Sequence, residues 1–196
     1  MSPLNRDADH LARLREYHAR HRGFPSYARM GEVLGMVSKA AVKKLLERLE
    51  EQGFLQRSAD GVWTPGERFF QRSLAASPVR AGLPTAEEAA NAEPFLIDAF
   101  LVEHPNRTVL VPVTGDSMIE AGIHDGDVVV VDCGLEARAG DLVVAVVDSA
   151  FTLKELARDA EGFVLKPHNA AYPLIRPRER LEIFGVVTGL ARKYRR

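Results

Sequence analysis

The chain has 196 residues, of which 46% are hydrophobic and 27% charged, a composition typical of a folded protein of one or two domains and unlike that of a disordered chain. It has no run of about 20 apolar residues that could span a membrane, and its charged N-terminus lacks the pattern of a signal peptide. Its single cysteine, Cys133, excludes an intrachain disulfide. Together these features predict a cytoplasmic protein. The formal net charge of -1 is unevenly distributed. Residues 1–74 hold 13 Lys and Arg against 9 Asp and Glu, whereas residues 75–196 hold 13 Lys and Arg against 18 Asp and Glu. The basic first third is therefore the part expected to meet a polyanion.

Three helices are predicted in this first third. The first has apolar residues at helical spacing and ends at residues 23–25, Gly-Phe-Pro. Ser26 is a candidate N-cap of a second helix that ends at Gly35, and Ser38 is the candidate N-cap of a third that ends before Gly53. The third helix presents a stripe of apolar residues for burial, namely Ala41, Val42, Leu45, Leu46 and Leu49.

The joint between the second and third helices is only Gly-Met-Val at 35–37, the tight turn of a helix-turn-helix. A β-hairpin is predicted next, because two short strand-forming runs flank Ser-Ala-Asp-Gly at 58–61. Three helices and a hairpin predict a winged helix-turn-helix domain over residues 1–66.

The exposed side of the third helix favours DNA binding over the alternative, a small helical interaction domain. Ser38, Lys39, Lys43 and Lys44 lie near its start and off the apolar stripe, where a recognition helix enters the major groove. Lysines contact phosphates or guanine edges, and a serine hydroxyl can donate to a phosphate oxygen. Arg57 on the hairpin is predicted to hold a neighbouring phosphate.

A linker is predicted at residues 67–77, and a second domain at 78–196. From about Arg107 the hydrophobic period becomes that of β-strands, with short β-branched runs at residues 108–113, 128–131, 142–147, 163–165 and 181–187. No long helical pattern alternates with these runs, which predicts an all-β second domain and an α+β fold for the whole chain.

Two positions interrupt the strand pattern. Ser117 lies in Thr-Gly-Asp-Ser-Met at 114–118, where a strand ends in a glycine turn with an exposed hydroxyl. A turn into a short helix would direct backbone N–H groups at the same point, a geometry that can hold an oxyanion. Lys154 lies in the strand-forming run 151–156, where alternation places it on one face with Thr152 and Leu156.

Ser117 and Lys154 suggest a serine–lysine dyad. Burial lowers the pKa of a lysine below its usual value of about 10.4, so a neutral amine can take the proton of a serine hydroxyl without a histidine. From the residues alone the ordinary readings stay open, because most serines in such turns are turn residues and most strand lysines lie in solvent.

The remaining reactive side chains predict neither a metal site nor a cofactor. The six histidines do not cluster with Asp or Cys at the spacing of metal ligands, and the sequence has no Gly-rich phosphate loop. Cys133 follows a valine run and is predicted to be a small buried residue, not a nucleophile.

The arrangement as a whole resembles the LexA repressor family, the self-cleaving regulators of the bacterial DNA-damage (SOS) response. The resemblance covers nearly the full chain and rests on elements in the family's order and at about its spacing. These are the winged helix, Val-Arg-Ala-Gly at 79–82, Thr-Gly-Asp-Ser-Met at 114–118 with Asp-Gly-Asp at 125–127, and Phe-Thr-Leu-Lys at 151–154.

The resemblance implies a bacterial repressor that binds operator DNA and cuts its own backbone, as a serine endopeptidase acting on itself. Ser117 would be the nucleophile, Lys154 the general base, and the bond between Ala81 and Gly82 the scissile bond. The backbone N–H groups of Ser117 and Met118 would hold the oxyanion.

The resemblance also implies partners. A homodimer would form through the C-terminal strand, within residues 185–194, and a RecA filament on single-stranded DNA would promote cleavage. One departure concerns the operator: the best-known members offer Asn and Glu at the start of the recognition helix, whereas residues 38–44 here read Ser-Lys-Ala-Ala-Val-Lys-Lys. The operator is therefore predicted to differ, as in a second, divergent repressor.

Three other classes of protein remain open. A phage-type repressor would share the same self-cleaving domain. A DNA-binding regulator could use its β domain only to dimerise or to sense a ligand. A signal peptidase could use the same dyad, but it requires a membrane anchor.

Overall fold

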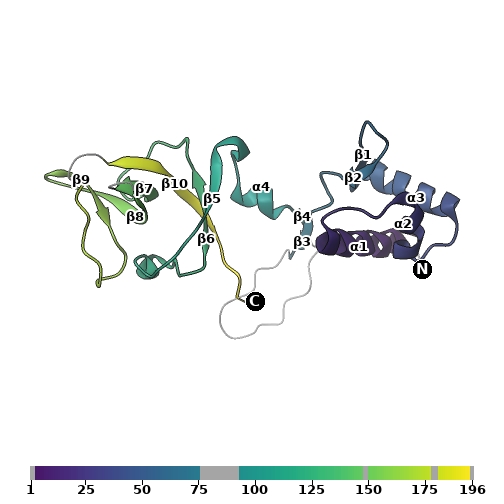
Figure 1. Cartoon of the computed structure of the whole chain (residues 1–196), viewed down its shortest axis with the longest axis horizontal. Helices are drawn as coiled ribbons and strands as arrows, with labels where there is room; N and C mark the ends of the chain where they lie inside the picture. Colours follow the sequence, from purple (N-terminus) through teal and green to yellow (C-terminus); the bar gives the residue numbers. More distant parts are fainter. Residues whose placement is uncertain (1–2, 76–92, 148–149, 178–180, 195–196) are drawn as a thin grey trace. The chain divides into compact units, whose positions relative to one another are not determined.

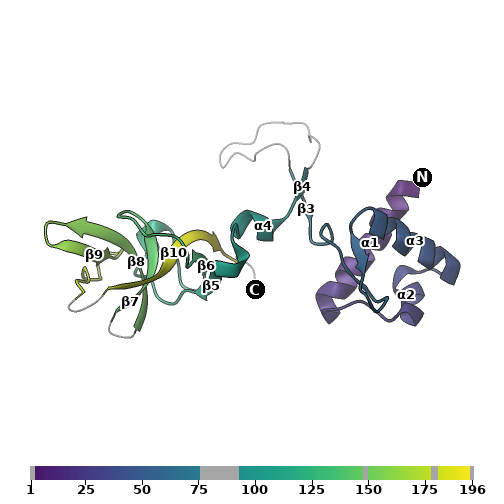
Figure 2. The same ribbon diagram turned by 90° about the horizontal axis from the view of Figure 1, so that it is seen from above.

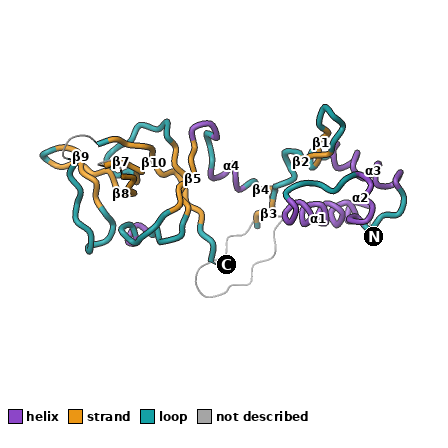
Figure 3. The backbone as a smooth tube through the Cα atoms, in the orientation of Figure 1, coloured by secondary structure: helices purple, strands orange, loops and turns teal. Residues whose placement is uncertain are grey.

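The computed structural model describes residues 3–75, 93–147, 150–177 and 181–194. The chain divides into two compact units, Met1–Ile97 and Asp98–Arg196. The first unit is mainly helical and the second is built around one antiparallel sheet (Figures 1 and 3). The α+β class predicted from the sequence is confirmed.

Three helices form the core of the first unit: α1 (Pro3–His21), α2 (Tyr27–Leu34) and α3 (Lys39–Glu51). Trp63 and Phe69 join the same buried cluster, whose helical members are Leu11, Leu14, Met30, Leu34, Val42, Leu45, Leu46 and Leu49. Arg48 of α3 donates two hydrogen bonds of 2.7 Å to the Asp7 carboxylate in α1. This ion pair fastens the first helix to the third.

The turn between α2 and α3 has the residues that its backbone requires. Gly35 adopts a left-handed conformation with a φ of 67°, which glycine reaches without steric cost. Ser38 caps α3, because its Oγ accepts a hydrogen bond of 3.3 Å from the backbone N–H of Ala41. Ser26 stands at the N-cap of α2 as predicted, but its side chain makes no capping hydrogen bond.

Two strand pairs follow the helices. β1 (Leu55–Arg57) and β2 (Trp63–Pro65) form the predicted antiparallel hairpin, with Arg57 opposite Trp63. β3 (Arg72–Leu74) pairs antiparallel with β4 (Glu93–Phe95). The stretch expected to be a linker, residues 67–77, thus contributes both the buried Phe69 and a strand.

The second unit contains a six-stranded antiparallel sheet in the order β5-β6-β10-β7-β8-β9 (Figure 2). A short helix, α4 (Ile97–Leu101), lies at its start, and two short 3-10 helices, η1 (Pro105–Arg107) and η2 (Ile119–Ala121), lie in its loops. The strands are β5 (Thr108–Pro112), β6 (Val128–Asp132), β7 (Leu142–Val147), β8 (Ala150–Asp159), β9 (Gly162–Lys166) and β10 (Glu182–Ala191).

The sheet is covered on both faces. Val144 of β7 belongs to one buried cluster, whereas Val143 and Ala145 belong to another, because successive side chains of a strand point to opposite faces. The first cluster also contains Met118 and Ile123 from the loop between β5 and β6. These two side chains anchor the loop that carries Ser117 to the sheet.

The prediction that Cys133 is buried is wrong, since this cysteine is exposed. The valine run of β6 ends at Asp132, whose side chain is 5% exposed and lies 2.8 Å from the guanidinium of Arg107. Cys133 is the first residue beyond the strand, where the chain turns to the surface. The burial that the pattern assigned to Cys133 belongs to Asp132.

Candidate functional site

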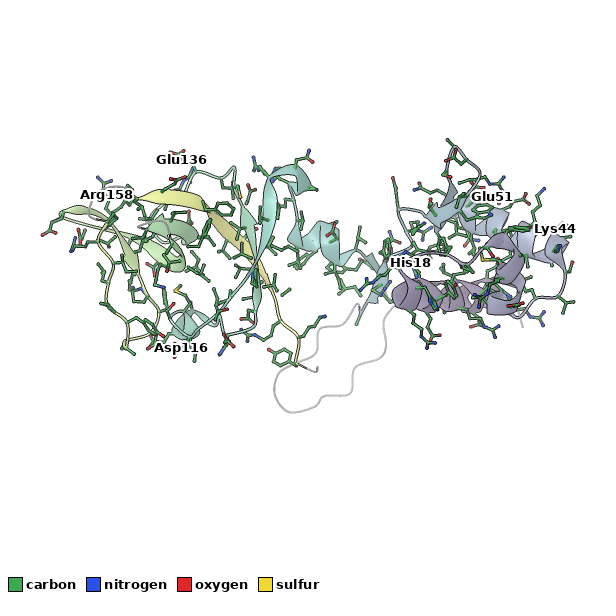
Figure 4. The ribbon with its side chains drawn as sticks, viewed as in Figure 1. His18, Lys44, Glu51, Asp116, Glu136 and Arg158 are labelled. Atoms are coloured by element: carbon green, nitrogen blue, oxygen red, sulfur yellow. The ribbon has the colours of Figure 1, made fainter. Side chains whose placement is uncertain are left out.

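Ser117 lies in the turn that follows β5, and the neighbouring motif residues explain its shape. Gly115 has a φ of 92°, a conformation that strains any other residue. Its backbone N–H donates a hydrogen bond of 2.9 Å to Oδ1 of Asp125. The segment Thr-Gly-Asp-Ser-Met at 114–118 is therefore hydrogen-bonded directly to Asp-Gly-Asp at 125–127. Figure 4 labels Asp116, which immediately precedes Ser117 in this turn.

Lys154 reaches this turn from β8. Its side chain is buried, with 6% of the residue exposed, and its Nζ lies 2.8 Å from Ser117 Oγ. The same nitrogen donates to Thr152 Oγ1 at 3.1 Å and to the backbone carbonyl of Leu153 at 2.8 Å. Among the described residues no carboxylate pairs with Lys154.

Burial without an acidic partner lowers the pKa of Lys154 from its ordinary value. A neutral amine has two N–H donors and one lone pair. Thr152 and the Leu153 carbonyl can accept the two donors, which leaves the lone pair directed at the Ser117 hydroxyl. This geometry suits proton transfer from the hydroxyl to the amine.

Two hollows meet at Ser117 and Lys154. One, of about 260 Å³, is lined mainly by apolar side chains, among them Val113, Phe151 and Leu153. The other, of about 290 Å³, continues past the Ser117 hydroxyl to Tyr172. Because both hollows share Ser117 and Lys154, an extended peptide could lie across the hydroxyl with residues on either side of it.

The two predicted oxyanion donors lie beside the same hydroxyl. Met118 stands at the N-cap of η2, and Ser117 precedes it. Within the described part of the chain, the backbone N–H groups of Ser117 and Met118 donate no hydrogen bond.

A buried ion pair supports the loop behind Ser117. The Asp127 side chain is 2% exposed and accepts hydrogen bonds of 2.6 Å from Arg192 Nε and Nη2. It also accepts one of 2.7 Å from the backbone N–H of His124. The hydrogen bond from Arg192 is the main reason that the pKa of Asp127 falls to about 2.

The sequence predicted the position of Lys154 but not its supporting contacts. Thr152 could have been assigned a role, because alternation already placed it on the face of Lys154. No signal in the sequence marked Asp127 and Arg192 as partners, since they are 65 residues apart.

The predicted DNA-contacting residues share one region of the first unit. Lys39, Lys43 and Lys44 are exposed on α3, and Figure 4 shows the labelled Lys44 projecting from this helix. Arg57 stacks its guanidinium 4.4 Å from the ring centroid of Trp63. A hollow of about 510 Å³ brings Lys43 and Arg57 together with Tyr27.

The predicted scissile residues, Ala81 and Gly82, lie outside the described residues. In the described ranges no three His, Cys, Asp or Glu side chains are grouped as metal ligands would be. The helices of these same ranges include none with the length and apolar character needed to cross a membrane.

Comparison with known proteins identifies the family. The Peptidase S24-like family matches residues 74–188. The chain is 36% identical over 179 residues to the LexA repressor of Opitutus terrae, with 88% of each chain covered. It is 32% identical over 181 residues to the LexA repressors of Bacillus thuringiensis (strain Al Hakam) and Bacillus anthracis, with 86% of each chain covered. The family predicted from the sequence motifs is confirmed, and the chain belongs to the LexA repressor family.

Proposed function

We propose that this chain is a transcriptional repressor that inactivates itself by cutting the peptide bond between Ala81 and Gly82. Ser117 is the nucleophile and Lys154 the general base. The observation that carries the proposal is the contact of 2.8 Å between Ser117 Oγ and a buried lysine amine that has no acidic partner among the described residues. The domain division proposed from the sequence, with residues 1–66 and 78–196 joined by 67–77, separates the two activities, and Phe69 of the joining stretch packs in the core of the first unit.

The reaction follows from these positions. Lys154 takes the proton of the Ser117 hydroxyl while Oγ forms a bond to the carbonyl carbon of Ala81. The backbone N–H groups of Ser117 and Met118 stabilise the oxyanion that develops. The bond to the Gly82 nitrogen then breaks, and Lys154 returns its proton to that amine. A water molecule, deprotonated by Lys154, finally hydrolyses the ester on Ser117.

A serine–lysine dyad of modest catalytic power is sufficient here, because the proposed substrate is part of the same chain. The scissile segment belongs to the same chain as Ser117, so its effective concentration at the cleft is high. Ala81 has a small side chain and Gly82 has none, so both suit a narrow cleft. Control of the reaction then depends on whether the segment occupies the cleft.

The decisive experiment is mass spectrometry of the full chain after incubation at about pH 9–10, since burial lowers the pKa of Lys154 and high pH favours its neutral form. The expected result is two fragments that meet between Ala81 and Gly82. Ser117→Ala should stay whole under the same conditions. If the wild type stays whole at high pH and also with activated RecA, the peptidase proposal is refuted, and a β domain that only dimerises or senses a ligand takes its place.

The first unit is proposed to bind operator DNA as a winged helix-turn-helix. Support comes from α3, whose exposed start carries Lys39, Lys43 and Lys44, and from the hollow that Lys43 shares with Arg57 of the hairpin. These cations and Ser38 are proposed to contact phosphates and base edges. Binding-site selection tests this, and recovery of the standard family operator would contradict a divergent target.

A homodimer is proposed to form through β10. This strand pairs with β7 only as far as Val186, whereas it pairs with β6 up to Ala191. Over residues 187–191, one strand edge therefore has no neighbour within the described sheet and could pair with a second copy. Cleavage would break the covalent link between the helices of the first unit and the dimer, so that the short β3–β4 ladder would have to hold the two fragments together. Separation of the fragments would reduce the affinity for two half-sites.

The biological setting is proposed from the family. The chain would repress DNA-damage (SOS) genes in the bacterial cytoplasm, and a RecA filament on single-stranded DNA would favour the docked scissile segment, as a shift of population. Adding such filaments at neutral pH should accelerate cleavage. A chain that cleaves at high pH but ignores RecA would instead support a regulator outside this response, such as a phage-type repressor.

A further inference from the structure

The loop after β9 is fastened to the turn that carries Ser117. The backbone N–H of His168 donates to the carbonyl of Ser117 at 2.9 Å, and the His168 carbonyl accepts from the N–H of Glu120 at 2.8 Å. The Asn169 side chain donates to the backbone carbonyl of Asp116 at 3.1 Å, and the Tyr172 hydroxyl donates to the Asp116 carboxylate at 2.5 Å. Residues 168–172, here named the clamp loop, therefore hold the turn at several points.

The clamp loop is also tied to the strand of Lys154. The Nε2 of His168 lies 2.5 Å from Oε2 of Glu155, the residue that follows Lys154 in β8. The two side chains are 25% and 20% exposed, so this contact is partly shielded from water. The other charged group facing Glu155 among the described residues is Lys166 of β9, at 3.7 Å.

We propose that His168 is a positioning residue for self-cleavage, because its backbone holds Ser117 while its imidazole holds Glu155, the neighbour of Lys154. One residue thus connects the turn of the nucleophile to the strand of the base. This inference rests on the function proposed above for Ser117 and Lys154.

The need for such a connection follows from the fold. Lys154 is held in the sheet by ladder pairing with Val143, whereas Ser117 lies in an irregular turn outside every strand. Sheet hydrogen bonds therefore do not set the distance between the two groups. A misplacement of about 1 Å in a reacting pair can slow a reaction on the order of a hundredfold.

The test compares two substitutions of one residue in the full chain. His168→Leu keeps the approximate volume but removes the donor to Glu155, and it should slow alkaline self-cleavage by roughly tenfold to a hundredfold. His168→Gln supplies a side-chain N–H within reach of Glu155 and should restore most of the rate. Lys166→Ala is the matched control, since it removes the other charged neighbour of Glu155 without touching the clamp loop, and it should cleave like the wild type.

The pH profile separates positioning from simple loss of stability. Loosening the turn admits water to Lys154, so the midpoint of the rate increase should move to higher pH in His168→Leu and stay in place in His168→Gln. A purely structural role would lower the melting temperature and leave the midpoint unchanged. If His168→Leu folds poorly, Glu155→Ala breaks the same contact from the strand side and should give the same slowing.

The outcomes distinguish this inference from the proposed function. If the wild type cleaves and Ser117→Ala does not, wild-type rates in both His168→Leu and Glu155→Ala overturn the positioning role. Equal slowing by His168→Leu and His168→Gln also overturns it, because the donor would then be irrelevant. A wild type that never cleaves refutes the peptidase itself.

Discussion

Arg192 places its guanidinium against the carboxylate of Asp127, with Nε and Nη2 each 2.6 Å from one of the two oxygens. The same Nη2 donates to the carbonyl of Gly122 at 2.5 Å. The residue just beyond β10 is thereby joined to two points, Gly122 and Asp127, of the loop between Ser117 and β6.

Arg192→Ala should destabilise the second unit strongly, because it leaves a buried carboxylate without its cation. We expect the melting temperature to fall by at least about 5 °C. Adding Asp127→Asn should recover part of this loss, since the double variant has no buried charge. Arg176→Ala is the control, because its ion pair with Asp159 is half-exposed and should contribute little. A double variant less stable than Arg192→Ala would contradict this account.

The ion pair of Asp127 with Arg192 also predicts how the stability of the second unit depends on pH. The pKa of Asp127 is lowered from 3.8 to about 2, so its stabilising effect is fully present above the ordinary value and is lost as the pH falls through the folded value. Between about pH 4 and 2 the advantage of the wild type over the double variant Arg192→Ala/Asp127→Asn should therefore shrink. Thermal melting across this range measures the difference.

Lys154 predicts a pH dependence of stability with the same sign, but at higher pH. Burial lowers its pKa, so the unfolded chain binds more protons than the folded one between the lowered value and the ordinary one, and stability rises with pH there. In a Ser117→Ala background, which prevents cleavage, Lys154→Met should gain most in melting temperature near neutral pH and lose this gain as the pH rises. The cleavage rate of the wild type should rise through the same window. A rate that is independent of pH would exclude Lys154 as the base.

Lys43→Ala should weaken DNA binding about equally for all sequences if this lysine meets a phosphate. The slope of log affinity against log salt concentration should then decrease by about one. Arg20→Ala, which changes an exposed arginine of α1 paired with Glu16, is the matched control and should leave the slope unchanged. An unaltered slope in Lys43→Ala would remove it from the phosphate contacts.

Ala81→Phe should slow self-cleavage at least about tenfold, since a large side chain must enter a cleft suited to small residues. Gel electrophoresis over time measures the rate, and Ala75→Phe, outside the predicted scissile segment, serves as control. Undiminished cleavage of Ala81→Phe would place the scissile bond elsewhere.

Alkylation of Cys133 should leave cleavage unaffected. The thiol is exposed and does not line either hollow at Ser117, so iodoacetamide should label it readily in the folded chain. Loss of cleavage on labelling would show that the cysteine takes part in the reaction.

Local pattern predicted the elements but not the contacts between them. The Ser38 cap, the strand runs and the burial of Lys154 follow from spacing within a few residues. Cys133 was misplaced because the end of a strand cannot be read to one residue. The contact of Asp127 with Arg192 joins residues 65 positions apart, and that of Glu155 with His168 joins a strand to the loop beyond the next strand. Which charges meet depends on the topology of the sheet.

The strand order has a consequence for biosynthesis. In the sheet, β10 lies between β6 and β7, yet it is the last strand to be synthesised. The strands on either side of the Ser117 turn, β5 and β6, and the Lys154 strand, β8, are made before it, as are β7 and β9. A nascent chain therefore contains every residue of the dyad before it contains the strand that unites the two parts of the sheet. Such a late, long-range pairing forms slowly. It would protect an unfinished repressor on the ribosome from cutting itself before it can bind its operator.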